Sequence, residues 1–114
     1  MWISVKDLKR LDEISIRTQN SVYLFRVTDP THGKGLLSGG LLGQVEHEAS
    51  LCDEIADDQE PQFSARLEIG CCAFFYVYLS GSLRRLTTSE IQDVSWARIP
   101  TQAPTEGWEG VSNI

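Results

Sequence analysis

The stretch that decides the fold is Ile14-Ser15-Ile16-Arg17-Thr18-Gln19-Asn20-Ser21-Val22-Tyr23-Leu24-Phe25-Arg26-Val27-Thr28. Apolar and polar residues alternate through its first half, and β-branched and aromatic residues fill its second half, which together indicate two β-strands. Asn20 stands between them and tolerates the left-handed backbone that a tight turn demands, so the stretch predicts a β-hairpin. Apolar side chains occupy both faces of the second strand, Val22–Thr28. This pattern predicts a strand that is central in its sheet or covered by a helix.

In the segment before the hairpin, the apolar residues recur with a different spacing. Val5, Leu8 and Leu11 recur at helical spacing, with charged residues between them. An apolar stripe of this spacing is typical of an amphipathic helix that lays one side on a core. Residues 5–13 are therefore predicted to form a short N-terminal helix.

The segment after the hairpin is rich in turn residues and short apolar runs. Residues 29–35 contain one proline and two glycines and are predicted to form a turn. Gly39, Gly40 and Gly43 lie among apolar residues and predict strand bends or bulges of the kind that small barrels need at their corners. Further strands are expected over residues 44–48, 63–71, 72–79, 83–88 and 93–99.

The predicted elements add up to one small β domain. The fold class is mainly β: a small barrel-like or strongly curled antiparallel sheet of five to seven strands with a short N-terminal helix. The length of 114 residues fits one domain. We expect that domain over residues 1–99, and a C-terminal tail over residues 100–114, where prolines, glycines and polar residues prevail.

Charge and apolar content disfavour two classes of partner. The chain carries a net charge of −6, and its only adjacent basic pair is Arg84-Arg85, whereas nucleic-acid binders show dense basic stripes. A membrane-spanning helix needs about 20 apolar residues, but the longest uncharged apolar stretch, residues 69–79, has 11. No signal peptide is recognisable, and three cysteines, two of them adjacent, fit a reducing compartment. We therefore expect a cytoplasmic protein that binds neither nucleic acid nor membrane.

Several short stretches resemble a known group of proteins. They are Arg17–Tyr23, the Gly39-Gly40 pair, Arg66-Leu67-Glu68-Ile69-Gly70 and Thr88-Ser89-x-Ile91. The chain resembles a group of short, uncharacterised bacterial all-β proteins in which a T-x-N-S-x-Y hairpin precedes a Gly-Gly strand and a closing T-S-x-V/I turn. The likeness covers roughly residues 14–99. It implies a compact bacterial β domain and transfers no functional residue.

The cysteines and one histidine form the strongest candidate for chemistry. Cys52, Cys71, Cys72 and His47 could supply four metal ligands or a redox pair. Adjacent residues of a strand point to opposite faces, so one extended strand cannot aim both neighbouring thiols at one ion. The C-x-x-C spacing of structural zinc sites is also missing. We favour packing of these cysteines in the core, and we expect no cofactor.

Two segments are candidates for contact with a partner. Trp108 and Val111 stand in the polar tail and need a surface to dock on. The acidic stretch 46–60, which includes Glu46 and Glu48, is either a docking surface for a basic partner or a plain solvated loop. Aromatic side chains on strands, such as Tyr23, Tyr76 and Trp96, could line a ligand face but are more often core.

No catalytic arrangement stands out, since no nucleophile lies in a G-x-S-x-G or comparable setting. We therefore predict a non-catalytic protein-interaction or regulatory module that self-associates. The alternative is a small-molecule or metal-binding domain that uses Cys52, Cys71, Cys72 and His47.

Overall fold

A computed structural model describes residues 2–52 and 66–98. Within these ranges the chain forms nine β-strands and three short 3-10 turns, and no α-helix. The strands are β1 (Trp2–Ser4), β2 (Glu13–Thr18), β3 (Val22–Asp29), β4 (Lys34–Gly39), β5 (His47–Cys52), β6 (Arg66–Glu68), β7 (Phe74–Leu79), β8 (Ser82–Thr87) and β9 (Ile91–Ala97). The turns are η1 (Val5–Asp7), η2 (Pro30–His32) and η3 (Gly40–Leu42).

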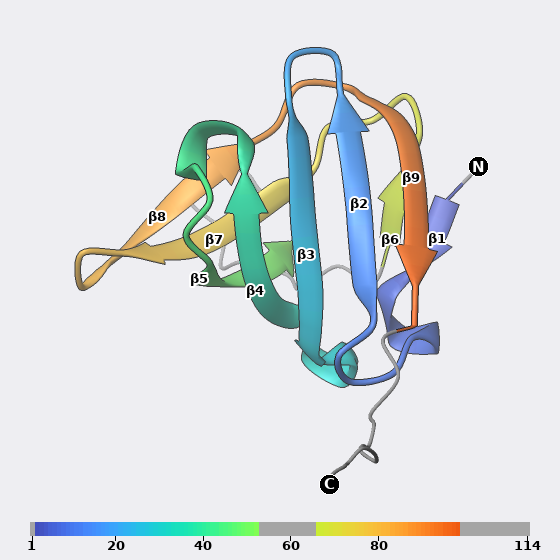
Figure 1. Ribbon diagram of the computed structural model, residues 1–114, viewed down its shortest axis with the longest axis horizontal. Helices are drawn as coiled ribbons and strands as arrows, with labels where there is room; N and C mark the ends of the chain where they lie inside the picture. Colours follow the sequence, from blue (N-terminus) through green and yellow to red (C-terminus); the bar gives the residue numbers. More distant parts are fainter. Residues whose placement is uncertain (1, 53–65, 99–114) are drawn as a thin grey trace, which may run out of the picture.

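The strands form two antiparallel sheets (Figure 1). Seven of them lie in the order β8-β7-β5-β4-β3-β2-β9, and β1 pairs with β6 in a second, two-stranded sheet. The expected mainly β, antiparallel fold is confirmed, but the described residues form nine strands in two sheets, more than the five to seven strands predicted. The large sheet ends at β8 on one side and β9 on the other, so it does not close into a barrel.

One face of the large sheet is buried because the sheet curls. The rings of Phe25 on β3 and Phe75 on β7 have centroids only 5.3 Å apart, although β4 and β5 lie between their strands. In a flat sheet, three strand spacings would separate them by roughly 14 Å. Ile14, Leu37 and Leu51 are buried in the same cluster. The curl therefore wraps one continuous core.

The predicted hairpin is confirmed as β2 and β3, with Glu13 paired to Arg26 and Arg17 to Val22. The strand β3 is central in the sheet, as expected. Its residues Tyr23, Phe25 and Val27 are buried. No helix formed by residues 2–52 and 66–98 covers its opposite face.

The turn of this hairpin is stabilised by hydrogen bonds of a threonine side chain, and not by a left-handed asparagine. Among the described residues other than glycine, only Leu11 and Ser80 have a positive φ, so the left-handed conformation predicted for Asn20 is wrong. The hydroxyl oxygen of Thr18 instead accepts the backbone N–H of Asn20 at 3.4 Å and that of Ser21 at 3.1 Å. The same hydroxyl donates to the carbonyl of Ser21 at 3.2 Å.

The predicted N-terminal helix over residues 5–13 is wrong, because only the single turn η1 forms. The backbone N–H of Leu11 donates to the carbonyl of Val27 at 2.7 Å, and the N–H of Val27 donates to that of Asp12 at 2.9 Å. Glu13 then pairs in β2 with strands on both sides. A helix through residue 13 would forfeit these bonds, so strand pairing outweighs the helical spacing of the apolar residues.

Three segments that are distant in the sequence come together at one end of the sheet. The N–H of Gly70 donates to the carbonyl of Ile91, and the N–H of Ile91 donates to the carbonyl of Cys71, both at 2.9 Å. The side chain of Asn20 donates to the hydroxyl of Ser89 at 2.7 Å. We call this contact between residues 70–73 and 88–91, together with the β2–β3 turn, the strand-end joint. In Figure 1 the β2–β3 turn and the β8–β9 connection meet at the top of the view.

The Gly39-Gly40 pair ends β4 rather than bulging it. Gly39 pairs with Tyr23, and the turn η3 begins at Gly40. A Cβ atom on Gly40 would lie 2.3 Å from Cζ of Tyr23, and the φ of Gly40 is +49°. A residue without a side chain is therefore needed where the buried tyrosine crosses the chain.

Candidate functional site

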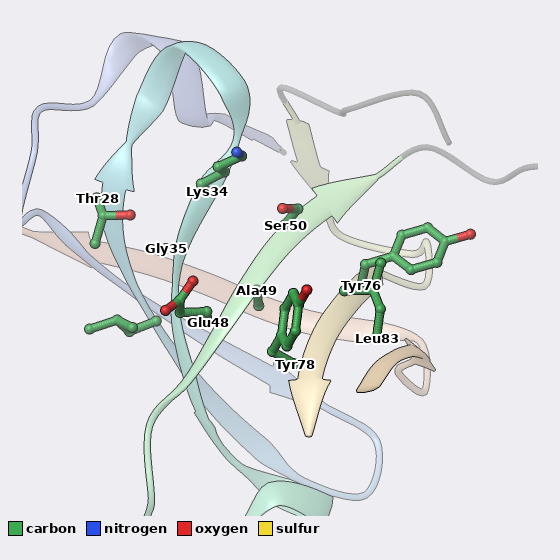
Figure 2. Close-up of a pocket in the computed structure, with 10 residues that line it drawn as sticks. Thr28, Lys34, Gly35, Glu48, Ala49, Ser50, Tyr76, Tyr78 and Leu83 are labelled. Atoms are coloured by element: carbon green, nitrogen blue, oxygen red, sulfur yellow. The ribbon is translucent and has the colours of Figure 1, made fainter. Parts of the chain in front are cut away.

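A groove of about 460 Å³ opens on the outer face of the large sheet, opposite the core (Figure 2). It crosses β4, β5, β7 and β8, and its walls include Lys34, Leu36, Glu48, Ser50, Tyr78 and Leu83. We call it the outer-face groove.

The paired strands β4 and β5 form the floor of the groove. Gly35 pairs with Ala49 there, and both residues are buried on the core side, so their backbone and not their side chains lines the outer face. Gly35 is required there, because its Cβ would lie 2.4 Å from the carbonyl oxygen of Arg26 and 2.8 Å from the ring of Phe25. The flanking pairs, Lys34 with Ser50 and Leu36 with Glu48, form its sides.

The pairing of β5 with β7 ends beside the groove. Their ladder runs from Cys52 and Phe74 to Ala49 and Val77. Tyr78 is the next residue of β7, and in Figure 2 its ring lies on one side of Ala49 while Glu48 lies on the other. The end of the ladder therefore leaves Tyr78 facing open space.

The far wall of the groove is the edge of the sheet. Leu83 of β8 pairs directly with Tyr78, and these two side chains are 56% and 54% exposed. Every residue of β8 except Leu86 is exposed. A leucine and a tyrosine that pack on each other at an edge strand, and remain half exposed, form an apolar patch available to a partner.

Charge is unevenly placed around this patch. Arg84 and Arg85 on β8 are the only charged residues between positions 69 and 89. Lys34 and Glu48 contribute one charge of each sign inside the groove. The hairpin of β7 and β8 is therefore locally basic in a chain whose net charge is −6.

The two acidic residues predicted to contact a partner differ in their surroundings. Glu46 precedes β5 and forms an ion pair with Arg26 at 3.3 Å, and Arg26 also contacts Glu13 at 3.6 Å. Glu48 lines the outer-face groove. Trp108, Val111 and residues 53–60 of the acidic stretch lie outside the described residues.

The aromatic residues of the candidate ligand face also differ in their burial. Tyr23 is in the core, as favoured, whereas Trp96 is 46% exposed and its ring lies 5.3 Å from the guanidinium of Arg98. Tyr76 lines the groove. Sequence reasoning left Tyr78 and Leu83 out of the candidate site, because apolar residues on both faces of residues 74–79 do not distinguish a covered strand from one beside a sheet edge.

The cysteines do not share one environment. Cys52 is buried on β5, and its thiol donates to the carbonyl of Ser50 at 3.4 Å. Cys71 and Cys72 are exposed, so the expectation that they pack in the core is wrong for this pair. They lie in a turn after Gly70, whose φ is +92°, and not on a strand. In residues 2–52 and 66–98, no three His, Cys, Asp or Glu side chains are grouped closely enough to hold a metal ion.

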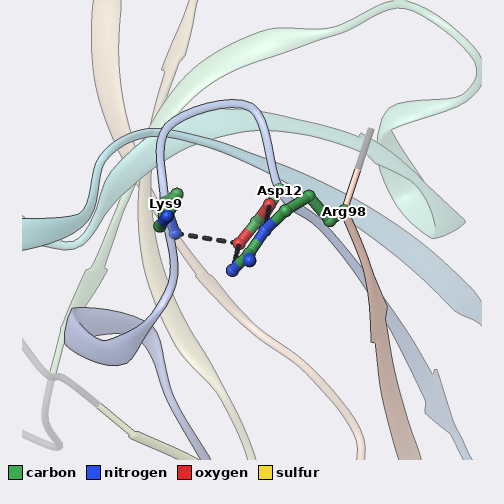
Figure 3. Close-up of polar contacts among 3 residues, drawn as sticks. All are labelled: Lys9, Asp12 and Arg98. Carbon is green, nitrogen blue, oxygen red and sulfur yellow. Dashed lines mark hydrogen bonds and ion pairs between the residues drawn. The ribbon is translucent and has the colours of Figure 1, made fainter. Parts of the chain in front are cut away.

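Two carboxylates, those of Asp12 and Asp29, accept hydrogen bonds from neighbouring side chains. The carboxylate of Asp12, 1% exposed, accepts from Nε of Arg98 at 3.1 Å, from its Nη2 at 3.2 Å and from the backbone N–H of Lys9 at 2.8 Å (Figure 3). The bonds from Arg98 hold the pKa of Asp12 below its usual value. Asp29 similarly accepts from His32, with 2.9 Å between Nδ1 and Oδ2, and this bond lowers the pKa of Asp29. Both carboxylates are satisfied within the chain, so we assign them structural roles.

Comparison with protein-family models, with curated proteins and with solved structures finds no match. Within the described residues, no helix has the length and apolar character that crossing a membrane requires. The function therefore has to be argued from the geometry of the surface.

Proposed function

We propose that this chain is a non-catalytic protein-interaction module and that the outer-face groove, with the Tyr78–Leu83 pair at its edge, is its contact surface. The observation that carries the proposal is this half-exposed pair, which joins β7 to the edge strand β8 beside a groove of about 460 Å³.

Burial of Tyr78 and Leu83 by a partner would contribute favourable free energy to binding. Full burial of a large apolar side chain contributes about 1.5–3 kcal/mol. Each of these two residues keeps roughly half of its surface in water, so a partner that covers both gains about 1.5–3 kcal/mol from them. Tyrosines are enriched in binding hot spots because a large apolar ring ends in a hydroxyl that can remain hydrogen-bonded.

The test is co-purification from cells of the source organism, with a matched control on the same sheet face. The variant Tyr78→Ser/Leu83→Ser removes the apolar pair and should lose the partner. The control Val22→Ser removes an equally exposed side chain, 50%, from β3 outside the groove and should retain it. Equal recovery of the partner by both variants would refute the assignment of this surface.

Self-association remains part of the proposal, but β8 is an unfavourable edge for it. Antiparallel pairing of two β8 strands in a register centred on Arg84-Arg85 would bring these arginines of one copy opposite those of the other, and like charges in that position are destabilising. Arginines on an edge strand also oppose unspecific pairing between copies. Three reduced cysteines support a cytoplasmic location, which is part of the same proposal.

The volume of the groove also suits a small molecule, since ligand pockets typically enclose about 300–1,000 Å³. This second candidate predicts a bound compound of defined mass in native mass spectrometry of the purified chain. A spectrum of the bare chain would remove that candidate. The cysteine-based metal site stays a prediction of the sequence alone.

A further inference from the structure

We propose that Cys71 and Cys72 form a redox-sensitive switch: a low-mass disulfide such as oxidised glutathione closes a disulfide bond between the two neighbouring thiols, and closure loosens the strand-end joint. The inference goes beyond the proposed function and does not depend on it. It concerns two exposed thiols that do not line the outer-face groove.

Both thiols are accessible, and no strand keeps them apart. Cys71 and Cys72 are exposed, whereas Cys52 is buried. Adjacent residues of a strand point to opposite faces, but this pair lies between β6, which ends at Glu68, and β7, which begins at Phe74. The alternation that would separate two neighbouring thiols on a strand therefore does not apply here.

A turn brings the backbone of the pair against the β8–β9 connection. The N–H of Cys71 donates to the carbonyl of Glu68 at 3.2 Å, and Gly70 between them has a φ of +92°, as at the third position of a type II turn. The carbonyl of Cys71 accepts from the N–H of Ile91 at 2.9 Å. That carbonyl belongs to the peptide bond that joins Cys71 to Cys72, so the contact with Ile91 depends on the orientation of this peptide.

Closure of the disulfide turns this peptide. The Cα atoms of neighbouring residues are about 3.8 Å apart, below the separation of roughly 4.4–6.8 Å that disulfide-linked residues usually have. A bond between neighbours therefore distorts the backbone between them and moves the carbonyl of Cys71 away from the N–H of Ile91. The same distortion makes such a disulfide easy to reduce, so the switch is reversible.

The distortion stays within the strand-end joint, because the chain is held again directly after the pair. The N–H of Ala73 donates to the hydroxyl of Thr88, and the carbonyl of Ala73 accepts from the N–H of Thr88, both at 2.9 Å. Only Cys72 lies between this anchor and the contact of Cys71 with Ile91. The exchange of the Ile91 amide is therefore the most sensitive readout of closure.

The reaction is a thiol–disulfide exchange in two steps. The thiolate of one cysteine attacks a sulfur of oxidised glutathione, which forms a mixed disulfide and releases one glutathione. The thiolate of the other cysteine then attacks the cysteine sulfur of the mixed disulfide and releases the second glutathione. The protein gives up two electrons and two protons, and the two released glutathione thiols carry them.

The test incubates the full chain with excess oxidised glutathione, stops the reaction with acid and measures the intact mass and the modified peptides. We expect the loss of two hydrogen atoms at Cys71 and Cys72, an unmodified Cys52, and recovery of the original mass after reduction with dithiothreitol. In the oxidised chain the amide of Ile91 should exchange about tenfold faster, as expected for the loss of one hydrogen bond. Amides of β4, which takes no part in the strand-end joint, should exchange as before.

The variants Cys71→Ser and Cys72→Ser are matched controls, because each keeps one exposed thiol and cannot close the bond. Each should retain one bound glutathione and leave the exchange of Ile91 at the reduced rate. A wild-type chain that retains glutathione, that links to a second copy through these cysteines or that does not react at all would overturn the proposal. A closed disulfide with unchanged exchange at Ile91 would overturn it as well, because the joint would then not respond to the bond.

Discussion

The substitution Thr88→Val tests the strand-end joint. The hydroxyl of Thr88, a residue 4% exposed, accepts the backbone N–H of Ala73 at 2.9 Å and donates to the carbonyl of Ser89 at 2.8 Å. Valine keeps the shape and removes both bonds, which leaves the buried N–H of Ala73 without this acceptor. An unsatisfied buried donor costs about 1–3 kcal/mol, so we expect the free energy of unfolding to fall by about 1–3 kcal/mol.

The assay is urea unfolding followed by circular dichroism, with thermal unfolding as a second probe. For a chain of this size the loss corresponds to a fall of about 4–12 °C in Tm. The control is Thr87→Val, which changes an exposed neighbour on β8 and should shift stability by no more than about 0.5 kcal/mol. Equal stability of the Thr88→Val and wild-type chains would show that this hydroxyl does not hold residues 73 and 88 together.

Three further predictions concern single contacts. Gly40→Ala places a Cβ 2.3 Å from the ring of Tyr23 and should cost about 1–3 kcal/mol in urea unfolding, more than Gly81→Ala, whose Cβ would meet nothing within 4 Å. Asp12→Asn should lower stability at pH 7 by about 1–3 kcal/mol because it removes charge-assisted bonds. The folded pKa of Asp12 is depressed, so this stabilisation is complete above the unfolded pKa of about 4 and disappears as the pH falls through the folded pKa. The difference in unfolding free energy between the wild-type chain and Asp12→Asn should therefore shrink only below about pH 4. A difference that is constant down to about pH 2 would contradict the assignment. Cys71 and Cys72 should react with a thiol reagent in the native chain, whereas Cys52 should react only after unfolding, and mass spectrometry of the labelled peptides counts them.

The elements that were predictable from sequence are those in which one strand face is buried. Ile14 and Ile16 alternate with polar residues in β2, so period-two spacing located that strand. β7 is apolar on both faces and was located by its run of aromatic and β-branched residues. The N-terminal helix failed for a physical reason: Val5 and Leu8 are buried at helical spacing, but backbone pairing of residues 11–13 with β3 decides the conformation. That pairing joins residues about 15 apart in sequence and leaves no local signal.

The candidate site shows the same limit. The spacing of Phe74, Tyr76 and Tyr78 predicts that they share one face, but only the strand order reveals that β8 is an edge and that Tyr78 is half exposed. Likewise, the sequence predicts strands over residues 63–71 and 72–79, whereas Cys71 and Cys72 lie in an exposed turn. In that turn the N–H of Gly70 donates to the carbonyl of Ile91, and the N–H of Ile91 donates to the carbonyl of Cys71. Burial depends on partners distant in sequence, which composition and periodicity do not specify.

The most direct test of the central claim is amide hydrogen exchange of the full chain, alone and in complex with its co-purified partner. The account predicts slower exchange in β8 around Leu83, and unchanged exchange at the opposite edge strand, β9. Protection confined to β9, or to any surface that excludes β7 and β8, would contradict the claim that the Tyr78–Leu83 edge is where this protein binds.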